Sequence, residues 1–412
     1  MGEFRGAKLA VYGALPGEEV TVTAIKKRRK LVYAQATAVI TPSVNRVTPV
    51  CSYADLCAGC CLQHCDTDTQ LKHKQKFLLE QLGENQPVGL LDPLTGPVQN
   101  YRCKARLGVK YVEKKDKVLV GFHEKLSSFV ADIDRCIVLE ESVGTILADL
   151  GAAISRLQCR SSIPQIEIAV GEDCSALVFR HLEPLPESDR EKLTSFAEQK
   201  NLHIYLQPGG PDTSHRLWPL GGGERLRYTL PEFDIDMTFH PLDFTQVNFQ
   251  QNRNMVSQTL KLLEIDSNDR VLDLYCGIGN FSLPLARRAE TVLGVEGSPR
   301  SVNRAQENAR RNSIENAEFR VADLTKPEFF SGWFEDSFDK AVIDPPRSGA
   351  LDVCRLLQNS NVKKVVYVSC NPTTLGRDSK ILIDGGFTLR SAGVIDMFPH
   401  TGHVESIALF EK

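Results

Sequence analysis

The segment "RVLDLYCGIGNFSLPLA", residues 270–286, joins a short apolar run to a glycine turn and then to a helix-like stretch. Gly277 and Gly279 permit a tight turn with close approach of the backbone, and we expect a helix to begin near Phe281. Four more strand-like runs follow, "TVLGVEG", "AEFRVADL", "KAVIDPP" and "KVVYVSC", and they alternate with helical stretches. This alternation predicts a doubly wound parallel sheet in the C-terminal half.

Polar residues end the five predicted strands. In chain order they are Asp273, Glu296, Asp323, Asp344 and Cys370. Open parallel sheets bind their ligands outside the carboxyl ends of the strands. Four acids and one cysteine along one rim therefore predict a functional site.

The ligand predicted at the glycine turn is a nucleoside without a pyrophosphate. A dinucleotide-binding turn would carry a third glycine at position 282, where this chain has Ser282. Glu296 can accept hydrogen bonds from both ribose hydroxyls, and Asp323 can take the amino group of adenine. These contacts suit S-adenosylmethionine, so we expect a binding site for this methyl donor.

Cys370 lies in "VYVSCNPTTLGRD", residues 366–378, where a buried strand runs into a loop. A free cysteine in such a place is most often a small packed apolar residue. Beside a methyl donor it has a second interpretation, because a thiolate that adds to C6 of uracil makes C5 nucleophilic. A helix capped near Thr373 or Thr374 is expected just after it, which should lower the pKa of the thiol and leave it partly ionised near neutrality.

The route through C6 also needs a base that removes the proton from C5. Glu405 begins the last predicted strand and reaches the same rim if the sheet ends in an antiparallel hairpin. A glutamate beside an apolar pocket suits this task, although an exposed strand end is the ordinary alternative. His400 and His403 are the other candidates, more plausibly structural or substrate-orienting. In "IDPPR", Asp344 could hold a flat heterocycle; Arg347 stands where adenine N6 methyltransferases carry an aromatic residue.

The remainder of the chain divides into two further predicted domains. Residues 1–46 read as the short strands of an OB-like β-barrel, with the basic run "KKRRK" at 26–30 available for phosphates, although the net charge of the whole chain is only −3. Residues 47–235 form a central α+β domain, with a helix at about 68–82 that could pack on the catalytic domain of residues 236–412. The chain has no membrane span or signal-like start, so we expect a cytoplasmic protein.

Twelve cysteines in a cytoplasmic chain indicate metal ligands, catalytic thiols or buried side chains rather than disulfides. Cys51, Cys57 and Cys60 follow the spacing C-x5-C-x2-C, and Cys136 stands alone downstream. Four thiolates can bind zinc or an iron–sulfur cubane. Paired C-x2-C knuckles would favour zinc, whereas three clustered ligands and a distant fourth favour a cluster.

Together these motifs resemble the RNA uracil-5 methyltransferases that carry an N-terminal TRAM barrel and an iron–sulfur cluster, especially the branch that acts on large-subunit ribosomal RNA. The similarity extends over nearly the whole chain. The stretches that carry it are "GALPGE", "PSVNRVTPVC", "CAGCCLQH", "GFHEKLSSFVADIDRC", "DFTQVNFQQNRNM", "VLDLYCGIGNFSLPLA", "GVEGS", "DPPRSG", "SCNPTTLGRD" and "DMFPHTGHVE". One departure is Cys103, which stands where the family usually has Asn.

The resemblance implies a role for each candidate residue. Cys370 would be the nucleophile and Glu405 the base. The contacts to S-adenosylmethionine would be Gln246, Tyr275, Asn280, Glu296, Asp323 and Asp344. The ligands of a [4Fe–4S] cluster would be Cys51, Cys57, Cys60 and Cys136.

The activity implied is methylation of C5 of a specific uridine in RNA, with 23S ribosomal RNA as the expected substrate. A base that must enter a pocket implies a single-stranded or looped RNA with the uridine flipped out. The alternatives are uridine 54 of transfer RNA, a non-catalytic RNA-binding iron–sulfur protein, and N-methylation of adenine or protein, for which Cys370 would be dispensable. A monomer is the default expectation.

Overall fold

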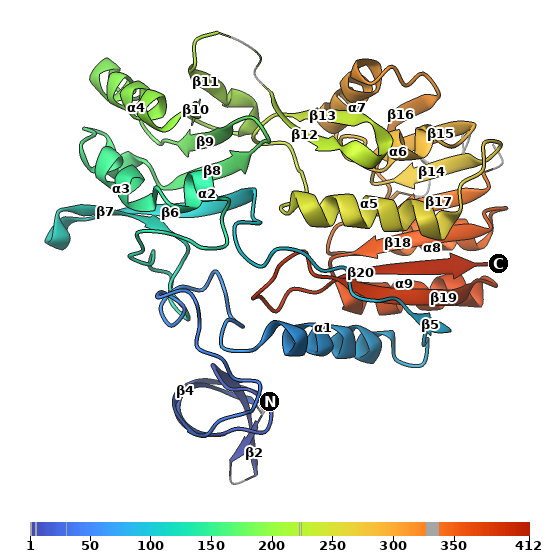
Figure 1. Cartoon of the computed structure of the whole chain (residues 1–412), viewed down its shortest axis with the longest axis horizontal. Helices are drawn as coiled ribbons and strands as arrows, with labels where there is room; N and C mark the ends of the chain where they lie inside the picture. Colours follow the sequence, from blue (N-terminus) through green and yellow to red (C-terminus); the bar gives the residue numbers. More distant parts are fainter. Residues whose placement is uncertain (1, 5, 30, 222, 224, 327–337) are drawn as a thin grey trace.

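The N-terminal strands form a small curved sheet, coloured dark blue in Figure 1. The computed structural model describes residues 2–4, 6–29, 31–221, 223, 225–326 and 338–412, so the last residue of the basic run 26–30 lies outside it. The strands are β1 (Gly2–Phe4), β2 (Ala7–Tyr12), β3 (Glu19–Arg28) and β4 (Leu31–Thr41), paired in the order β1-β2-β4-β3. The assignment of this unit as a TRAM barrel stays a prediction.

A six-stranded sheet forms the middle of the chain. Its order is β11-β10-β9-β8-β6-β7, with β9 and β10 parallel and the other pairs antiparallel. The strands are β6 (Lys104–Val112), β7 (Lys117–Gly121), β8 (Gln165–Val170), β9 (Ser175–Arg180), β10 (Leu202–Gln207) and β11 (His215–Trp218). The helices α2 (Glu141–Gly144), α3 (Leu147–Ser155) and α4 (Glu187–Lys200) accompany it.

The C-terminal sheet has eight strands in the order β16-β15-β14-β17-β18-β20-β19-β5. The strands are β5 (Gly89–Leu90), β14 (Arg270–Leu274), β15 (Thr291–Glu296), β16 (Ala317–Val321), β17 (Lys340–Ile343), β18 (Lys364–Ser369), β19 (Thr388–Ile395) and β20 (Glu405–Glu411). The run from β16 to β18 is parallel, and β20 is antiparallel to both of its neighbours. The doubly wound sheet and its closing antiparallel hairpin are therefore confirmed.

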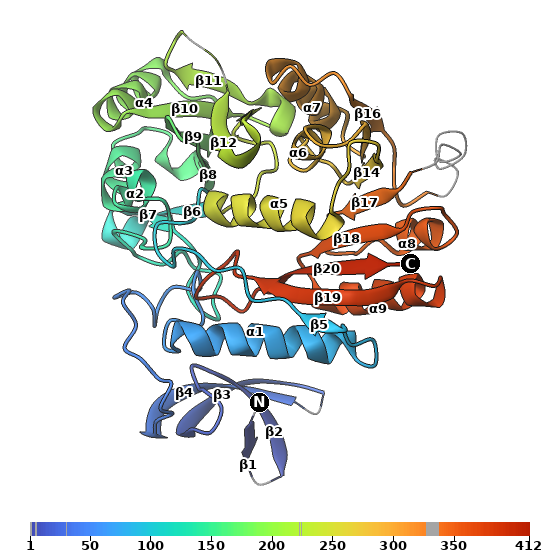
Figure 2. The ribbon, with the colours of Figure 1, turned by 45° about the vertical axis from the view of Figure 1, so that its right-hand side comes forward.

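Helices cover both faces of this sheet. On one face the helices are α5 (Phe249–Leu263), α6 (Ser282–Ala286) and α7 (Pro299–Arg311). On the other face they are α1 (Thr67–Leu82), α8 (Leu351–Gln358) and α9 (Pro372–Asp384). Figure 2 shows α1 and α5 on opposite sides of β19 and β20. Because both faces are covered, β18 is a continuous apolar run, Val365–Val368, with every side chain buried.

One hairpin and one short edge strand were not foreseen in the sequence. The hairpin of β12 (Leu226–Leu230) and β13 (Ile235–Phe239) packs its buried side chains into the core shared with α5 and α7. The boundary proposed after residue 235 falls inside this hairpin. The two-residue strand β5 pairs with β19 and extends the edge of the C-terminal sheet.

Among the described residues, no helix combines the length and the apolar composition that crossing a membrane requires.

Candidate active site

Cys370 lies in the short connection between β18, which ends at Ser369, and α9, which begins at Pro372. Its side chain is half-buried. The residue after it, Asn371, caps α9 by accepting a hydrogen bond of 3.2 Å from the backbone N–H of Thr373. The cap expected at Thr373 or Thr374 is therefore wrong by two or three residues. Thr374 instead donates its hydroxyl to the carbonyl oxygen of Asn371 at 2.9 Å.

The protonation of the Cys370 thiol also differs from the sequence expectation. Burial raises its pKa to about 11, and the charges of Glu405 and Asp344 add to the rise, while Arg347 opposes it. The expected partly ionised thiol is thus wrong, because burial and two facing carboxylates outweigh the N-terminus of α9. The free protein holds Cys370 mainly as a thiol, and its proton must leave before the sulfur can act as a nucleophile.

Glu405 is the first residue of β20 and pairs with Ile395 at the end of β19. Burial raises the pKa of its carboxyl group to about 7, against the lowering effects of Arg347 and Lys74. A carboxylate with a pKa near 7 is matched to general base catalysis near neutrality. The structure therefore brings Glu405 into electrostatic contact with Cys370, at the rim predicted from the sequence.

Asp344 and Gln246 meet beside these two residues. The Gln246 side chain donates a hydrogen bond of 3.4 Å from Nε2 to Oδ2 of Asp344. Burial and the charge of Glu405 raise the pKa of Asp344 well above its usual range. Arg347, three residues further on, is exposed and lies with Nη2 3.4 Å from Nδ1 of His403. One edge of the C-terminal sheet thus carries two carboxyl groups, an amide and a guanidinium near the thiol.

The glycine turn after β14 holds Glu296 in place. Gly277 and Gly279 adopt φ values of +55° and +91°, a region that favours glycine. The Glu296 carboxylate accepts hydrogen bonds from the backbone N–H of Gly277 at 3.2 Å and of Ser298 at 3.0 Å. Tyr275 precedes the turn with φ of +67° and is half-buried.

Two other predicted contacts point elsewhere in this structure. The Asn280 amide accepts from Tyr228 Oη and from Asn252 Nδ2, both at 2.9 Å, and donates to Asn252 Oδ1 at 2.8 Å. It ties the glycine turn to α5. Asp323 accepts hydrogen bonds from the backbone and hydroxyl of Thr325.

Asp273, expected among the rim acids, is fully buried inside β14. Its Oδ2 accepts a hydrogen bond of 2.5 Å from Ser282, and burial raises its pKa to about 7. Ser282 is thus the residue that takes the place of a third turn glycine and also the partner of this buried acid. Of the predicted strand-end residues, Asp344 and Cys370 lie together with Glu405, and Asp273 does not belong to this group.

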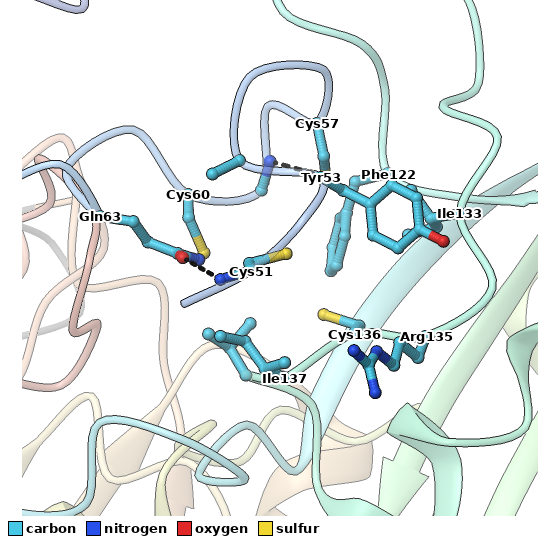
Figure 3. A pocket seen from close by; sticks show the side chains of 13 residues that line it. Cys51, Tyr53, Cys57, Cys60, Gln63, Phe122, Ile133, Arg135, Cys136 and Ile137 are labelled. Atoms are coloured by element: carbon cyan, nitrogen blue, oxygen red, sulfur yellow. Dashed lines mark hydrogen bonds between the residues drawn. The ribbon is translucent and has the colours of Figure 1, made fainter. Parts of the chain in front are cut away.

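The four cysteines singled out as cluster ligands line one pocket, together with Tyr53 and Phe122 (Figure 3). The sulfur atoms of Cys51, Cys60 and Cys136 turn toward its centre in this view. Cys57 lies over the pocket, and its Sγ accepts a hydrogen bond from the N–H of Gly59 at 3.3 Å. The chain thus collects four thiols from two segments about 76 residues apart in sequence, counted from Cys60 to Cys136.

The fit of this pocket to a metal group depends on its donors. Within the part of the chain that the structure describes, no group of three or more His, Cys, Asp or Glu side chains is arranged to hold a metal ion. Four thiols that line one pocket are a donor set that either zinc or an iron–sulfur cluster can use.

Two residues of α1 act on Glu405 and on the loop before it, and the sequence reasoning missed them. Lys74 acts on the pKa of Glu405, and Gln70 bonds the loop before it. Their partners lie more than 300 residues away, so no local pattern could have revealed them. The only sign of this role in the sequence is that a lysine and a glutamine lie among the apolar positions of α1. Both side chains are buried.

Comparison with known proteins places this geometry in context. The family model described as tRNA (Uracil-5-)-methyltransferase matches residues 66–412. The chain is 49% identical over 410 residues to the 23S rRNA (uracil(1939)-C(5))-methyltransferase RlmD of Alcanivorax borkumensis, covering 99% of this chain and 92% of that protein. The corresponding protein of Hahella chejuensis is 48% identical over 415 residues, covering 99% and 93%.

A solved structure is similar over almost the same length. It is the Pyrococcus abyssi tRNA (uracil-54, C5)-methyltransferase in complex with S-adenosyl-L-homocysteine. The TM-score is 0.74 and the identity 25%, with 98% of this chain and 95% of that chain covered.

Proposed function

The chain belongs to the tRNA (uracil-5-)-methyltransferase family, and from that membership we propose that it methylates C5 of a uridine in 23S ribosomal RNA. The observation that carries the proposal is the grouping of Cys370, Glu405 and Asp344 at one rim of the C-terminal sheet. Near-complete coverage by 23S rRNA methyltransferases favours ribosomal over transfer RNA. The solved transfer-RNA relative shares the fold at lower identity.

S-adenosylmethionine would supply an electrophilic methyl group in this site. Glu296, at the glycine turn, would accept the ribose hydroxyls, and Tyr275 would flank the adenine. Gln246 and Asp344 would orient the methyl end beside Cys370. Asn280 and Asp323 complete the proposed set, with Asn280 acting through the turn that its amide fastens to α5.

Cys370 would begin the chemistry by bonding through its sulfur to C6 of the uracil, as the thiol proton leaves. The electron pair of the C5–C6 double bond moves into an enolate, and C5 then takes the methyl group. Arg347 helps the first step because its positive charge lowers the pKa of Cys370 and faces the forming anion. A flipped uridine is required, since C6 is stacked and inaccessible inside a helix.

Glu405 would complete the reaction by taking the proton from C5. The electron pair of the broken C–H bond restores the C5–C6 double bond, and the sulfur of Cys370 leaves with the pair of the C–S bond. The bond between the methyl carbon and the sulfonium sulfur breaks during the transfer, and the thiolate of Cys370 takes back a proton at the end. The products are therefore 5-methyluridine, S-adenosylhomocysteine, the free enzyme and one released proton. A carboxylate with a pKa of about 7 can both accept that proton and return it to water near neutrality.

The four pocket cysteines would hold a [4Fe–4S] cluster, a group that in this position supplies structure rather than methyl transfer. Cys51, Cys57 and Cys60 come from one segment and Cys136 from the loop between β7 and α2, so a cluster would tie these two parts of the chain together. The N-terminal strands and the basic run 26–30 would contact the RNA that flanks the target.

The experiment that tests the proposal is methyl transfer from labelled S-adenosylmethionine to total RNA from a strain that lacks the gene. We expect label in 23S RNA, recovered as 5-methyluridine at one position, and none in transfer RNA. Label in transfer RNA alone would move the substrate to the alternative class. Absence of label in any RNA would support a non-catalytic RNA-binding protein.

A further inference from the structure

The loop between β19 and β20, residues 396–404, sets the position of Glu405, the proposed catalytic base. It ends immediately before Glu405. It also contains His403, whose ring lies 5.3 Å from that of Phe398 and whose Nδ1 lies 3.4 Å from Arg347. Movement of this loop, which we call loop 396–404, would therefore displace the Glu405 carboxylate relative to Cys370, which other elements hold.

Groups from distant parts of the chain satisfy the carbonyl oxygens of loop 396–404. The oxygen of Phe398 accepts from Lys74 Nζ and from the Thr401 hydroxyl, each at 2.9 Å. The oxygen of Pro399 accepts from the Tyr101 hydroxyl at 3.0 Å. Both carbonyls thus bind side chains of the preceding domain, which hold the loop from one side.

Lys74 on α1 also pairs with the first residue of the loop. Its Nζ lies 2.6 Å from Oδ1 of Asp396, and the two side chains are only 3% and 8% exposed. A buried charge persists only with a partner, so the pair fixes α1 against the loop. The positive charge of Lys74 also reaches Glu405 and opposes the rise in its pKa.

Gln70, one turn earlier on α1, holds the centre of the loop. Its Oε1 accepts from the backbone N–H of His400 at 3.0 Å, and its Nε2 donates to the carbonyl oxygens of Leu62 and Cys65 at 3.1 and 2.8 Å. The His400 carbonyl in turn accepts from the backbone N–H of Cys61 and Leu62 at 3.0 and 2.9 Å. His400 has φ of +64°, a conformation that costs energy for a non-glycine residue and persists only when such contacts hold it.

We propose that Lys74 and Gln70 are positioning residues for the base: they fasten loop 396–404 so that Glu405 faces C5 of the uracil bound to Cys370. This inference rests on the proposed function. Cys370 follows β18, whose last residue Ser369 pairs with Ser406 of β20, and Asn371 after it caps α9; these contacts do not involve loop 396–404, so release of the loop leaves the nucleophile in place. Loss of either fastening residue should therefore slow removal of the C5 proton while bonding to C6 and methyl transfer continue.

Single-turnover reactions of Lys74→Met with labelled 23S RNA test whether removal of the C5 proton slows while bonding to C6 and methyl transfer continue. The variant should accumulate a covalent protein–RNA adduct on a denaturing gel and release methylated RNA more slowly, on the order of tenfold to a hundredfold. Binding of S-adenosylmethionine should be unchanged. The matched control is Lys76→Met on the same helix, whose side chain is 75% exposed, and it should release RNA at the wild-type rate.

Lys74→Met leaves Asp396 buried without its partner, so a second variant guards against loss of folding. Lys74→Met/Asp396→Asn has no unpaired buried charge, but it still lacks the hydrogen bond from Lys74 to the carbonyl oxygen of Phe398. The adduct should therefore accumulate again. Release of methylated RNA at the wild-type rate by either folded variant would overturn the proposal. So would a parallel loss of adduct formation and release. Glu405→Gln serves as reference, because failure of that variant to trap RNA would reject the covalent mechanism itself.

Discussion

At the scale of single residues, the thiol of Cys370 and the carboxyl of Glu405 have raised pKa values for one reason. Burial raises both pKa values; the charges of Glu405 and Asp344 add to the rise for Cys370, whereas Arg347 and Lys74 oppose the rise for Glu405. The residue types and their places at strand ends could be predicted from the sequence. Their protonation could not, because it depends on burial that the sequence does not state.

The first prediction concerns the nucleophile. Cys370→Ala should abolish formation of 5-methyluridine, because the proposed nucleophile for C6 is removed, and it should still bind S-adenosylmethionine. Isothermal titration with the methyl donor and labelled methyl transfer to 23S RNA measure the two properties. Methylation at the wild-type rate by this variant would contradict covalent catalysis.

The second prediction concerns pH. Glu405 must be ionised to accept the C5 proton, so release of methylated RNA should rise with pH through about 7, the pKa of that carboxyl in the free protein. A pH series of single-turnover release rates checks this, with adduct formation followed in the same samples. A release rate independent of pH between 5 and 8, about the range in which such a group titrates, would argue against Glu405 as the base.

The third prediction concerns stability. The folded protein raises the pKa of Glu405, so the carboxyl destabilises the fold increasingly as pH rises from the ordinary value of 4.5 to the folded value of about 7. The penalty is absent below the first value and complete above the second. Glu405→Gln should therefore melt at a higher temperature than the wild type above pH 7, and the difference should shrink as pH falls toward 4.5. Thermal unfolding at a series of pH values decides it; a pH-independent difference would mean that the carboxyl is not perturbed.

At the scale of elements, the sequence pattern was most informative where strands are buried on both faces. The apolar runs of β14, β15, β17 and β18 revealed the parallel sheet, and the helix predicted at about 68–82 spans Thr67–Leu82. The pattern failed for β5, which has only two residues, and for the exact cap of α9. Short elements and caps depend on tertiary partners, which periodicity does not encode.

The fourth prediction tests the cap that holds Cys370. Asn371→Ala removes the acceptor for the backbone N–H of Thr373 and should lower the free energy of unfolding by about 1 kcal/mol. Urea denaturation measures this value. Asn359→Ala, at the C-terminal end of α8, is the control, because its side chain caps no helix N-terminus; an equal loss in the two variants would contradict the role assigned to Asn371.

At the scale of the whole molecule, the cysteine pocket, α1 and the C-terminal sheet form one connected assembly. Three of the four pocket cysteines could be recognised as a motif in the sequence because they lie within ten residues of one another. The connection between the cysteine pocket and Glu405 could not be read from the sequence, because this connection runs through the backbone of Cys61 and Leu62 to His400. Contacts of this kind leave no trace in residue type.

The fifth prediction concerns the proposed cluster. Protein purified without oxygen should contain iron and sulfide in equal amounts, and Cys60→Ala or Cys136→Ala should lose both, since these thiols line the pocket. Cys61→Ala should retain them, because Cys61 is exposed and does not line the pocket. Zinc in place of iron would reject the cluster.

The central claim is that the sulfur of Cys370 bonds to C6 of the target uridine, and the most direct test is mass spectrometry of the adduct trapped by Glu405→Gln. After digestion with protease and nuclease, we expect one cross-linked peptide that contains residues 364–371, with a methylated uridine attached at Cys370. A cross-link at any other residue, or methylated RNA released without a protein-bound stage, would contradict the account.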